Sequence, residues 1–387
     1  MHTPLRVLIG SLAPGMLPST SAPPPTGTIL LDLGADHPSH AGLLELRLWT
    51  EDGVVTSAHV VVGAMHRGVE KLFEVRDYRQ IIMLADRHDW QAPFSGELSV
   101  ALTCEQLLGL EIPPRAVWLR TLLAEHARIL SHTAFLGYLP HRLGLANGLP
   151  VVREALRDQT LRLTGNRIHP MANRIGGLAV DATPDWLSAE ASAMDAVRAA
   201  AEQARAWLQR PELAAETAGV AVLERGTIEQ YGVTGPAARA SGVDLDLRRQ
   251  RSYLAYAELA DLIPTPAHAT GDAWARLHLL AEELATSAAL VDACIAELRR
   301  TPGPVSVRLG KIVKLPEGEA YLAVEAPLGV AGVFLVSRGE KTPWRLKLRT
   351  PSFNHVAALE AVLPGVRVDR LEVTLASIGY VVGDLDK

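Results

Sequence analysis

Apolar residues follow different periods in successive parts of the chain. From Thr28 to Val62 they form short runs typical of strands, and Asp52-Gly53 is a strong hairpin-turn signal between the last two runs. The runs are 29–33, 44–49 and 54–62. From Arg67 onward aliphatic residues recur at helical spacing. The pattern therefore predicts a sheet first and helices after it.

The middle of the chain carries the longest helical patterns. Pro113-Pro114 opens one that continues to Leu136, because proline is tolerated in a first helical turn. Thr227-Ile-Glu-Gln230 has the pattern of a capping box for a short helix. Other helices are expected at 67–84, 150–163, 188–208, 271–298 and 352–362, and strands at 320–324, 332–336 and 344–348.

These patterns predict an α+β fold with a helical centre. The proline-rich tract from Leu17 to Thr26 indicates that residues 1–26 are a flexible arm. Residues 27–387 are expected to form a single domain, because no convincing linker interrupts them. Its predicted parts are a β unit at 27–65, a core of long helices at 66–300 and an α+β part at 301–387.

Composition excludes several classes of protein. The 38 basic and 43 acidic residues leave a net charge of −5, which disfavours a nucleic-acid partner. Cys104 and Cys294 are the only cysteines, too few to hold an iron–sulfur cluster or to build a disulfide framework. The apolar run from Leu328 to Val336 is too short to span a membrane, and Arg6 to Gly10 is too brief for a signal peptide. We expect any membrane association to be peripheral.

No phosphate loop or dinucleotide fingerprint occurs, so the candidate chemistry lies in polar clusters. The spacing of His37 and His40 suits metal ligation or proton donation, but two loop histidines that form only local hydrogen bonds would have the same spacing. Arg67 and Glu70 are spaced either for a functional pair or for an ordinary helix ion pair. The segment from Asp86 to Trp90 places titratable groups beside an aromatic ring, as a solvated helix end also does.

Two further stretches leave their interpretation open. Polar side chains recur along the helix after Pro113 and indicate either a buried polar track or a wet face. They are Arg115, Arg120, Glu125, Arg128 and His132. Arg167 and His169 precede a turn-rich segment, where an arginine beside a histidine can tune a neighbouring electron carrier.

Taken in order, several short motifs resemble those of one family. From about Leu31 to the C-terminus the chain resembles the D-type subunit, also called the forty-nine-kilodalton subunit, of NADH–quinone oxidoreductase, respiratory complex I. The motifs include His66-Arg-Gly-Val-Glu-Lys71, Asp86-Arg-His-Asp89, Pro113-Pro-Arg-Ala116, Gly165-Asn-Arg-Ile-His169, Arg239-Ala-Ser-Gly242 and Gly383-Asp-Leu-Asp386.

The resemblance implies a fold like that of the large subunit of nickel–iron hydrogenases. Those enzymes hold their metal with two pairs of cysteines, which Cys104 and Cys294 cannot supply, so no metal site is expected. In complex I the corresponding region is a quinone-head pocket shared with a small neighbour that carries the terminal iron–sulfur cluster. The chain is then expected to bind no cofactor alone: FMN and the clusters belong to partner subunits, NADH donates the electrons, and quinone binds at the shared site.

The resemblance also implies partners and a location. The expected partners are the small cluster-bearing subunit, a C-type neighbouring subunit and the membrane-arm subunits. The expected location is peripheral, on the cytoplasmic side of the inner or plasma membrane. Residue by residue, Arg67 matches the family arginine close to the terminal cluster, and His169 matches the histidine whose protonation is coupled to reduction of that cluster.

Three family positions near the quinone head are altered. Without a gap, His40 stands one residue early and Ala41 takes the place of the histidine ligand. Trp90 replaces the pocket tyrosine, and Gly379 replaces an acidic residue. In this interpretation Trp90 lines the head-group site together with His37 or His40, and Asp89 orients or protonates the donor.

We therefore expect a core subunit of a proton-translocating NADH–quinone oxidoreductase, an enzyme part that is inactive alone, and one that resembles a divergent second copy of the D-type subunit. The alternatives are a non-catalytic scaffold and an oxidoreductase module that serves a non-quinone acceptor.

Overall fold

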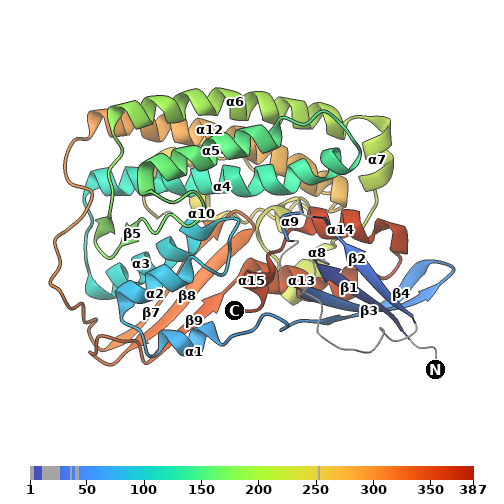
Figure 1. Cartoon of the computed structure of the whole chain (residues 1–387), viewed down its shortest axis with the longest axis horizontal. Coiled ribbons are helices and arrows are strands. Elements are labelled where there is room, and N and C mark those ends of the chain that lie inside the picture. Colours follow the sequence, from blue (N-terminus) through green and yellow to red (C-terminus); the bar gives the residue numbers. More distant parts are fainter. Residues whose placement is uncertain (1–3, 11–26, 35–36, 40–42, 252) are drawn as a thin grey trace.

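The computed structural model describes residues 4–10, 27–34, 37–39, 43–251 and 253–387. Figure 1 shows a layer of long helices along one side of the molecule, with two separate sheets and the shorter helices beneath it. Sheets and helices thus alternate along the chain in the order that the hydrophobic pattern predicted, and the α+β fold is confirmed.

The first sheet has the strand order β2-β1-β3-β4. Its strands are β1 (Leu5–Gly10), β2 (Thr28–Asp32), β3 (Leu43–Glu51) and β4 (Val54–Val61). β1 pairs in parallel with β2 and antiparallel with β3. Asp52 and Gly53 have φ angles of 48° and 77°, as the predicted tight turn requires.

The prediction of a flexible arm over residues 1–26 is wrong for its first part. Val7 and Ile9 of β1 are buried, because β1 lies between two other strands and contributes to the core. The remaining arm residues, 1–3 and 11–26, lie outside the described residues.

Four long helices form the layer at the top of Figure 1. They are α4 (Pro114–Arg142), α5 (Leu149–Thr164), α6 (Pro184–Leu208) and α12 (Ala273–Arg300). Small side chains such as Ala201 on α6 and Ala288 on α12 are fully buried in their shared core, which lets the helices pack closely. All four helices agree with the predicted ranges to within a few residues.

The C-terminal sheet contains β7 (Gly318–Ala326), β8 (Gly329–Ser337) and β9 (Arg345–Arg349) in that order. It shares a core with α2 (Tyr78–Ala85) and α3 (Pro93–Leu108), while α1 (Val69–Phe73) lies near the edge strand β9. The hydrophobic pattern did not predict α3, because its residues are buried around nearly the whole helix and leave no amphipathic period.

Short elements connect these layers. They are β5 (Asn173–Arg174), β6 (Gly177–Leu178), α7 (Pro211–Thr217), α8 (Arg225–Tyr231), α9 (Gly235–Arg239), α10 (Leu247–Gln250), α11 (Tyr256–Leu259), a 3₁₀ helix at Ala260–Leu262 and another at Val368–Arg370. The predicted capping box is wrong, because Thr227 lies inside α8, whose N-cap is Glu224.

The last helices return to the first sheet. α13 (Pro351–Val362), α14 (Leu371–Ile378) and α15 (Val382–Leu385) cover it, and Leu359 and Leu375 share a buried core with Ile9 and Leu46. The two ends of the described chain therefore stabilise one another. Within the described residues, no helix has the length and apolar character needed to cross a membrane.

Candidate functional site

The histidine loop, which we define as residues 37–39, packs against the turn between α2 and α3. His37 is fully buried, and its ring meets the Tyr138 ring edge-on at a centroid distance of 4.4 Å. The Pro38 carbonyl accepts hydrogen bonds from Trp90 Nε1 at 3.4 Å and from Gln91 Nε2 at 2.8 Å. The structure thus brings together two predicted site segments that lie about fifty residues apart in sequence. His40 and Ala41 lie outside the described residues.

Asp89 is buried beneath this loop and holds the α2–α3 turn. Its Oδ1 atom accepts hydrogen bonds from the backbone N–H groups of Gln91 and Ala92, at 3.0 and 3.1 Å. Burial, reinforced by the negative charge of Asp384, raises the pKa of Asp89 to about 7. Asp89 is therefore a turn residue and also a carboxyl group that can carry a proton near neutral pH.

His88 forms a buried pair with the C-terminal segment, residues 383–387. Its Nδ1 atom lies 2.9 Å from Asp384 Oδ1, and Asp384 Oδ2 accepts from the backbone N–H of Ser352 at 3.2 Å. Burial alone would raise the pKa of Asp384, but the contacts with His88 and Ser352 outweigh it and hold that pKa below its ordinary value. His88 and Asp384 are 296 residues apart in the sequence, so no motif predicted this pair.

The C-terminal segment packs closely against His88 and Trp90 because residue 383 is a glycine. A Cβ atom at this position would lie 2.3 Å from the Trp90 ring and 2.5 Å from the carbonyl oxygen of His88. Only glycine allows this approach. The third altered family position, Gly379, has φ 71° and closes α14 just before this segment.

A second group of titratable side chains lies around Asp86, which follows the last residue of α2. Its Nδ1 atom lies 3.4 Å from Asp86 Oδ1, and Arg87 Nε lies 3.0 Å from the same oxygen. Buried Glu97 accepts from the backbone N–H of Asn173 at 2.8 Å. Burial raises the pKa of Glu97 to about 8, and the nearby Asp86 charge adds to the shift. Asp86, at the end of α2, therefore lies close to His169 and Arg87, and its charge also acts on Glu97.

Arg67 does not join this cluster. Its side chain is exposed and forms no ion pair within the described part of the chain. The predicted helix pair with Glu70 is also not formed, because Glu70 binds Arg345 at 2.9 Å and accepts from the backbone N–H of Leu348 at 2.9 Å. The arginine that the structure places beside His169, through Asp86, is Arg87.

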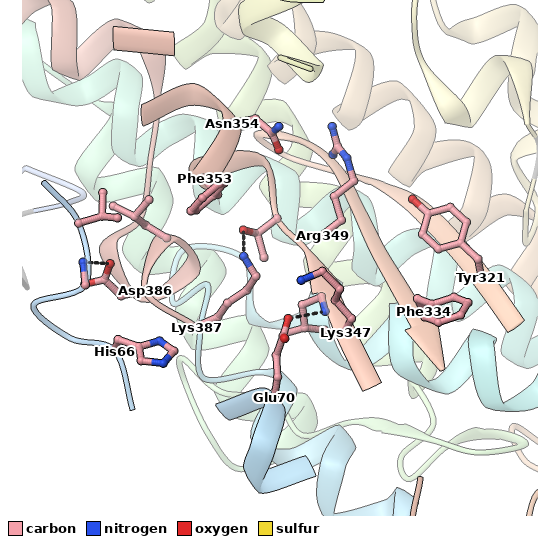
Figure 2. A pocket seen from close by; sticks show the side chains of 15 residues that line it. His66, Glu70, Tyr321, Phe334, Lys347, Arg349, Phe353, Asn354, Asp386 and Lys387 are labelled. Atoms are coloured by element: carbon pink, nitrogen blue, oxygen red, sulfur yellow. Dashed lines mark hydrogen bonds between the residues drawn. The ribbon is translucent and has the colours of Figure 1, made fainter. Parts of the chain in front are cut away.

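A cavity of about 590 Å³ opens beside the C-terminal segment. Figure 2 shows Lys347, Arg349 and Lys387 around it, with the aromatic rings of Tyr321, Phe334 and Phe353. Lys387 Nζ donates to Thr350 Oγ1 at 3.2 Å, and Asp386 accepts from the backbone N–H groups of Gly63 and Met65, both at 2.8 Å. Since its lining comes from distant parts of the chain, no local motif predicted the cavity.

The polar residues of α4 form a buried track, which decides between the two alternatives for that helix. Arg120, Glu125, Arg128 and His132 are at most 1% exposed. Arg120 binds Glu105 through two hydrogen bonds of 2.8 Å. Farther along, three guanidinium groups and four carboxylates form what we call the core charge network. It comprises Glu125, Arg128, Arg239, Asp246, Arg248, Glu283 and Glu325.

Metal-binding groups are sparse in the described ranges. No set of three histidine, cysteine, aspartate or glutamate side chains there is arranged to hold a metal ion. Cys104 and Cys294 are both buried in apolar cores, and this burial raises the pKa of each thiol.

Comparisons with known proteins agree on one family. Residues 149–314 and 307–387 match the family described as "Respiratory-chain NADH dehydrogenase, 49 Kd subunit". The chain is 47% identical over 367 residues to the D 1 subunit of NADH-quinone oxidoreductase from Streptomyces coelicolor, covering 93% of this chain and 95% of that protein. It is 46% identical over 363 residues to the D 2 subunit from Salinispora tropica, covering 93% of each chain.

A solved structure is also similar. It is a chain of the membrane-bound sulfane sulfur reductase, an archaeal respiratory membrane complex, with a TM-score of 0.83 and 29% identity. The match covers 89% of this chain and 94% of that chain.

Proposed function

Because the chain belongs to the 49 kDa subunit family of the respiratory-chain NADH dehydrogenase, we propose that it is a peripheral-arm core subunit of a proton-translocating NADH–quinone oxidoreductase. In this role it helps to form the quinone-reduction site beside the terminal iron–sulfur cluster of a partner subunit. The observation that carries the proposal is the packing of the histidine loop on Trp90 and Gln91, in the turn that the buried Asp89 holds.

In this proposal each residue of the site has a separate role. His37, His40 and Trp90 line the head-group position, and Asp89 holds the turn beneath it while carrying a proton near neutral pH. His169 faces the cluster of the partner subunit, and its Nδ1 atom lies 3.4 Å from Asp86 Oδ1. Arg67 is exposed and free to approach the same partner. When bound in the complex, FMN and the partner clusters supply the electrons that NADH provides.

The same proposal includes partners and location. The chain docks a small cluster-bearing subunit, a C-type neighbouring subunit and the membrane-arm subunits. It sits at the cytoplasmic face of the inner or plasma membrane as a peripheral subunit. Relatives named as numbered copies of the D subunit support a divergent second copy.

A second candidate function is reduction of a non-quinone acceptor. Trp90 cannot replace a phenol as a proton donor, because its only N–H group points to the Pro38 carbonyl and stays protonated at physiological pH. A similar fold also occurs in a complex named for sulfane sulfur reduction, so the family fold is compatible with more than one acceptor. A pure scaffold is the remaining alternative, and it would tolerate His169→Ala without altered electron flow.

The test is isolation of the tagged chain from native membranes, with partners identified by mass spectrometry and NADH-driven quinone reduction assayed on the same eluate. We expect the flavin and cluster subunits to co-elute with quinone reduction that stops on addition of a quinone-site inhibitor. Partners without quinone reduction would favour another acceptor or a scaffold, and an absence of partners would contradict the complex I role.

The altered residues allow a sharper test in the isolated complex. If divergence of the site limits quinone turnover, Ala41→His combined with Trp90→Tyr should raise quinone turnover at least tenfold. Ala41→His combined with Trp90→Phe is the matched control, since phenylalanine has the ring of tyrosine without the phenolic hydroxyl. Turnover that stays at zero in the double variant would rule out divergence at these two positions as the cause.

A further inference from the structure

Gln91 connects the histidine loop to a helix that carries none of the site residues discussed above. Its Nε2 atom donates to the Pro38 carbonyl at 2.8 Å, and its Oε1 atom accepts from Arg153 Nη2 at 2.5 Å. Gln91 is 7% exposed, so water does not compete for these bonds. We call this arrangement the Gln91–Arg153 bridge.

Arg153 is held in an unusual setting for an arginine. It lies on α5, and its Nε atom donates to the Leu130 carbonyl of α4 at 3.3 Å. It is partly buried, and within the described residues it forms no ion pair. Burial lowers the pKa of Arg153 to about 10, so the guanidinium remains charged at neutral pH. Its charge therefore strengthens the hydrogen bond to the Gln91 amide oxygen.

Several contacts hold the histidine loop, and two of them join the Pro38 carbonyl to the α2–α3 turn. The Trp90 N–H group reaches the Pro38 carbonyl only at 3.4 Å, a weak hydrogen bond, whereas the Gln91 bond is of ordinary length. Tyr138 contacts the His37 ring edge-on, and the Ser39 hydroxyl donates to the Tyr380 carbonyl. The Gln91–Arg153 bridge therefore supplies the stronger of the two hydrogen bonds that join the Pro38 carbonyl to the α2–α3 turn.

We propose that Gln91 and Arg153 are positioning residues for the acceptor site, because they fix the Pro38 carbonyl and hence the placement of His37 relative to Trp90. The inference rests on the proposed function for its catalytic meaning. Neither side chain needs to touch the acceptor. A misplacement of about 1 Å in a catalytic site can cost about a hundredfold in rate, so we expect the site to be sensitive to the loss of the Gln91 hydrogen bond.

Three variants separate the parts of the bridge in the isolated complex. Gln91→Leu removes both bonds. Gln91→Glu keeps an acceptor for Arg153 but loses the N–H donor to Pro38, whereas Arg153→Met removes only the charged donor. Arg157→Met is the matched control, because Arg157 lies one turn further along α5 and pairs at 2.6 Å with the exposed Glu154.

The first readout is a titration with a short-chain quinone. We expect the KM for quinone to rise at least tenfold in Gln91→Leu and Gln91→Glu and less in Arg153→Met, with partial rescue by Arg153→Lys. NADH oxidation by an artificial acceptor that bypasses the quinone site should stay unchanged in every variant. An unchanged KM and kcat in both Gln91 variants would overturn the inference.

The second readout does not depend on turnover. Amide hydrogen exchange in the isolated complex should speed up at least tenfold in a peptide covering residues 37–39 for Gln91→Leu and stay unchanged for Arg157→Met. Unchanged exchange in Gln91→Leu would also overturn the inference. If the unaltered complex reduces no quinone, the proposed function fails, and the exchange measurement alone decides whether the bridge holds the loop.

Discussion

At the scale of single residues, the buried carboxyl group of Asp89 makes the stability of the folded chain depend on pH. In the folded chain its pKa is about 7, well above the ordinary value of 3.8, because the side chain is buried beside Asp384. The folded state therefore holds the Asp89 proton more tightly than the unfolded state does. This contribution to stability is full below about pH 4 and is lost as the pH rises through 7.

Asp89→Asn removes that dependence while keeping an Oδ1 acceptor for the Gln91 and Ala92 N–H groups. We expect the variant and the unaltered chain to have similar stability near pH 4. Near pH 8 the variant should be more stable, by up to about 4 kcal/mol. Thermal unfolding of the full chain at several pH values checks this. Parallel pH curves for the two proteins would contradict it, and Asp195→Asn, at a highly exposed carboxylate, serves as the control.

Individual site residues were predictable from sequence only where a motif or a family pattern marked them. The resemblance led to His37, Trp90 and His169, and the structure places the first two against one another through Pro38. Gln91 and Arg153 carried no such mark. A glutamine after a tryptophan and an arginine on an amphipathic helix are common in sequences and indicate no special role. Only the tertiary fold brings Arg153 to Gln91 and Gln91 to the Pro38 carbonyl.

At the scale of elements, the contact between α2 and α3 depends on one missing side chain. A Cβ atom at Gly96 would lie 2.1 Å from the carbonyl oxygen of Ala85 and 3.2 Å from His88 Nε2. The end of α2 also carries Asp86 and leads into His88 and Asp89. The spacing of these two helices therefore affects the positions of the Asp86–His169 contact and the His88–Asp384 pair.

Gly96→Ala should force α3 away from α2 and destabilise the chain by about 1–3 kcal/mol. Gly226→Ala is the matched control, since it lies in helix α8 with no neighbouring atom within 4 Å and should be neutral or slightly stabilising. Melting temperatures of the two variants, measured side by side, provide the test. A Gly96→Ala melting temperature equal to that of the unaltered chain would show that the helices separate at no cost.

Hydrophobic periodicity predicted the helices well where one face of the helix is exposed to solvent. α6 and α12 keep such a face, and their ranges were predicted to within a few residues. α3 was missed because burial on nearly all sides removes the periodic signal. β1 was missed for another reason: its apolar run is short, and the proline-rich segment after it dominated the interpretation of the first 26 residues.

At the scale of the whole molecule, the core charge network joins the helical layer to the C-terminal sheet. Arg239, which ends α9, binds Glu283 of α12 and Glu325 of β7, each at 2.6 Å. Burial alone would raise the pKa of Glu283, but the positive charge of Arg239 and the hydrogen bond with His132 outweigh it and hold that pKa far below its ordinary value. Glu283 is therefore charged at neutral pH, whereas burial raises the pKa of Glu325, the other carboxyl group that Arg239 binds.

Arg239→Met should destabilise the chain by about 3–5 kcal/mol, because it leaves two buried carboxylates without a guanidinium partner. Combining it with Glu283→Gln should cost less than the sum of the two single changes, which a double-mutant cycle of unfolding free energies measures. Arg198→Met, which removes exposed ion pairs to Asp195 and Asp292, should change stability by less than about 1 kcal/mol. Strict additivity in the cycle would mean that Arg239 and Glu283 do not interact.

The packing of α13, α14 and α15 on the first sheet has a consequence for synthesis of the protein. Val7, Leu44 and Leu46 emerge from the ribosome early, but the helices that cover them come from residues beyond 350. Until those residues appear, the nascent chain displays an apolar sheet face with nothing from its own sequence to cover it. A message that breaks before this region would thus yield a fragment that holds all the long helices yet is prone to aggregate, and chaperones would have to shield it throughout most of its translation.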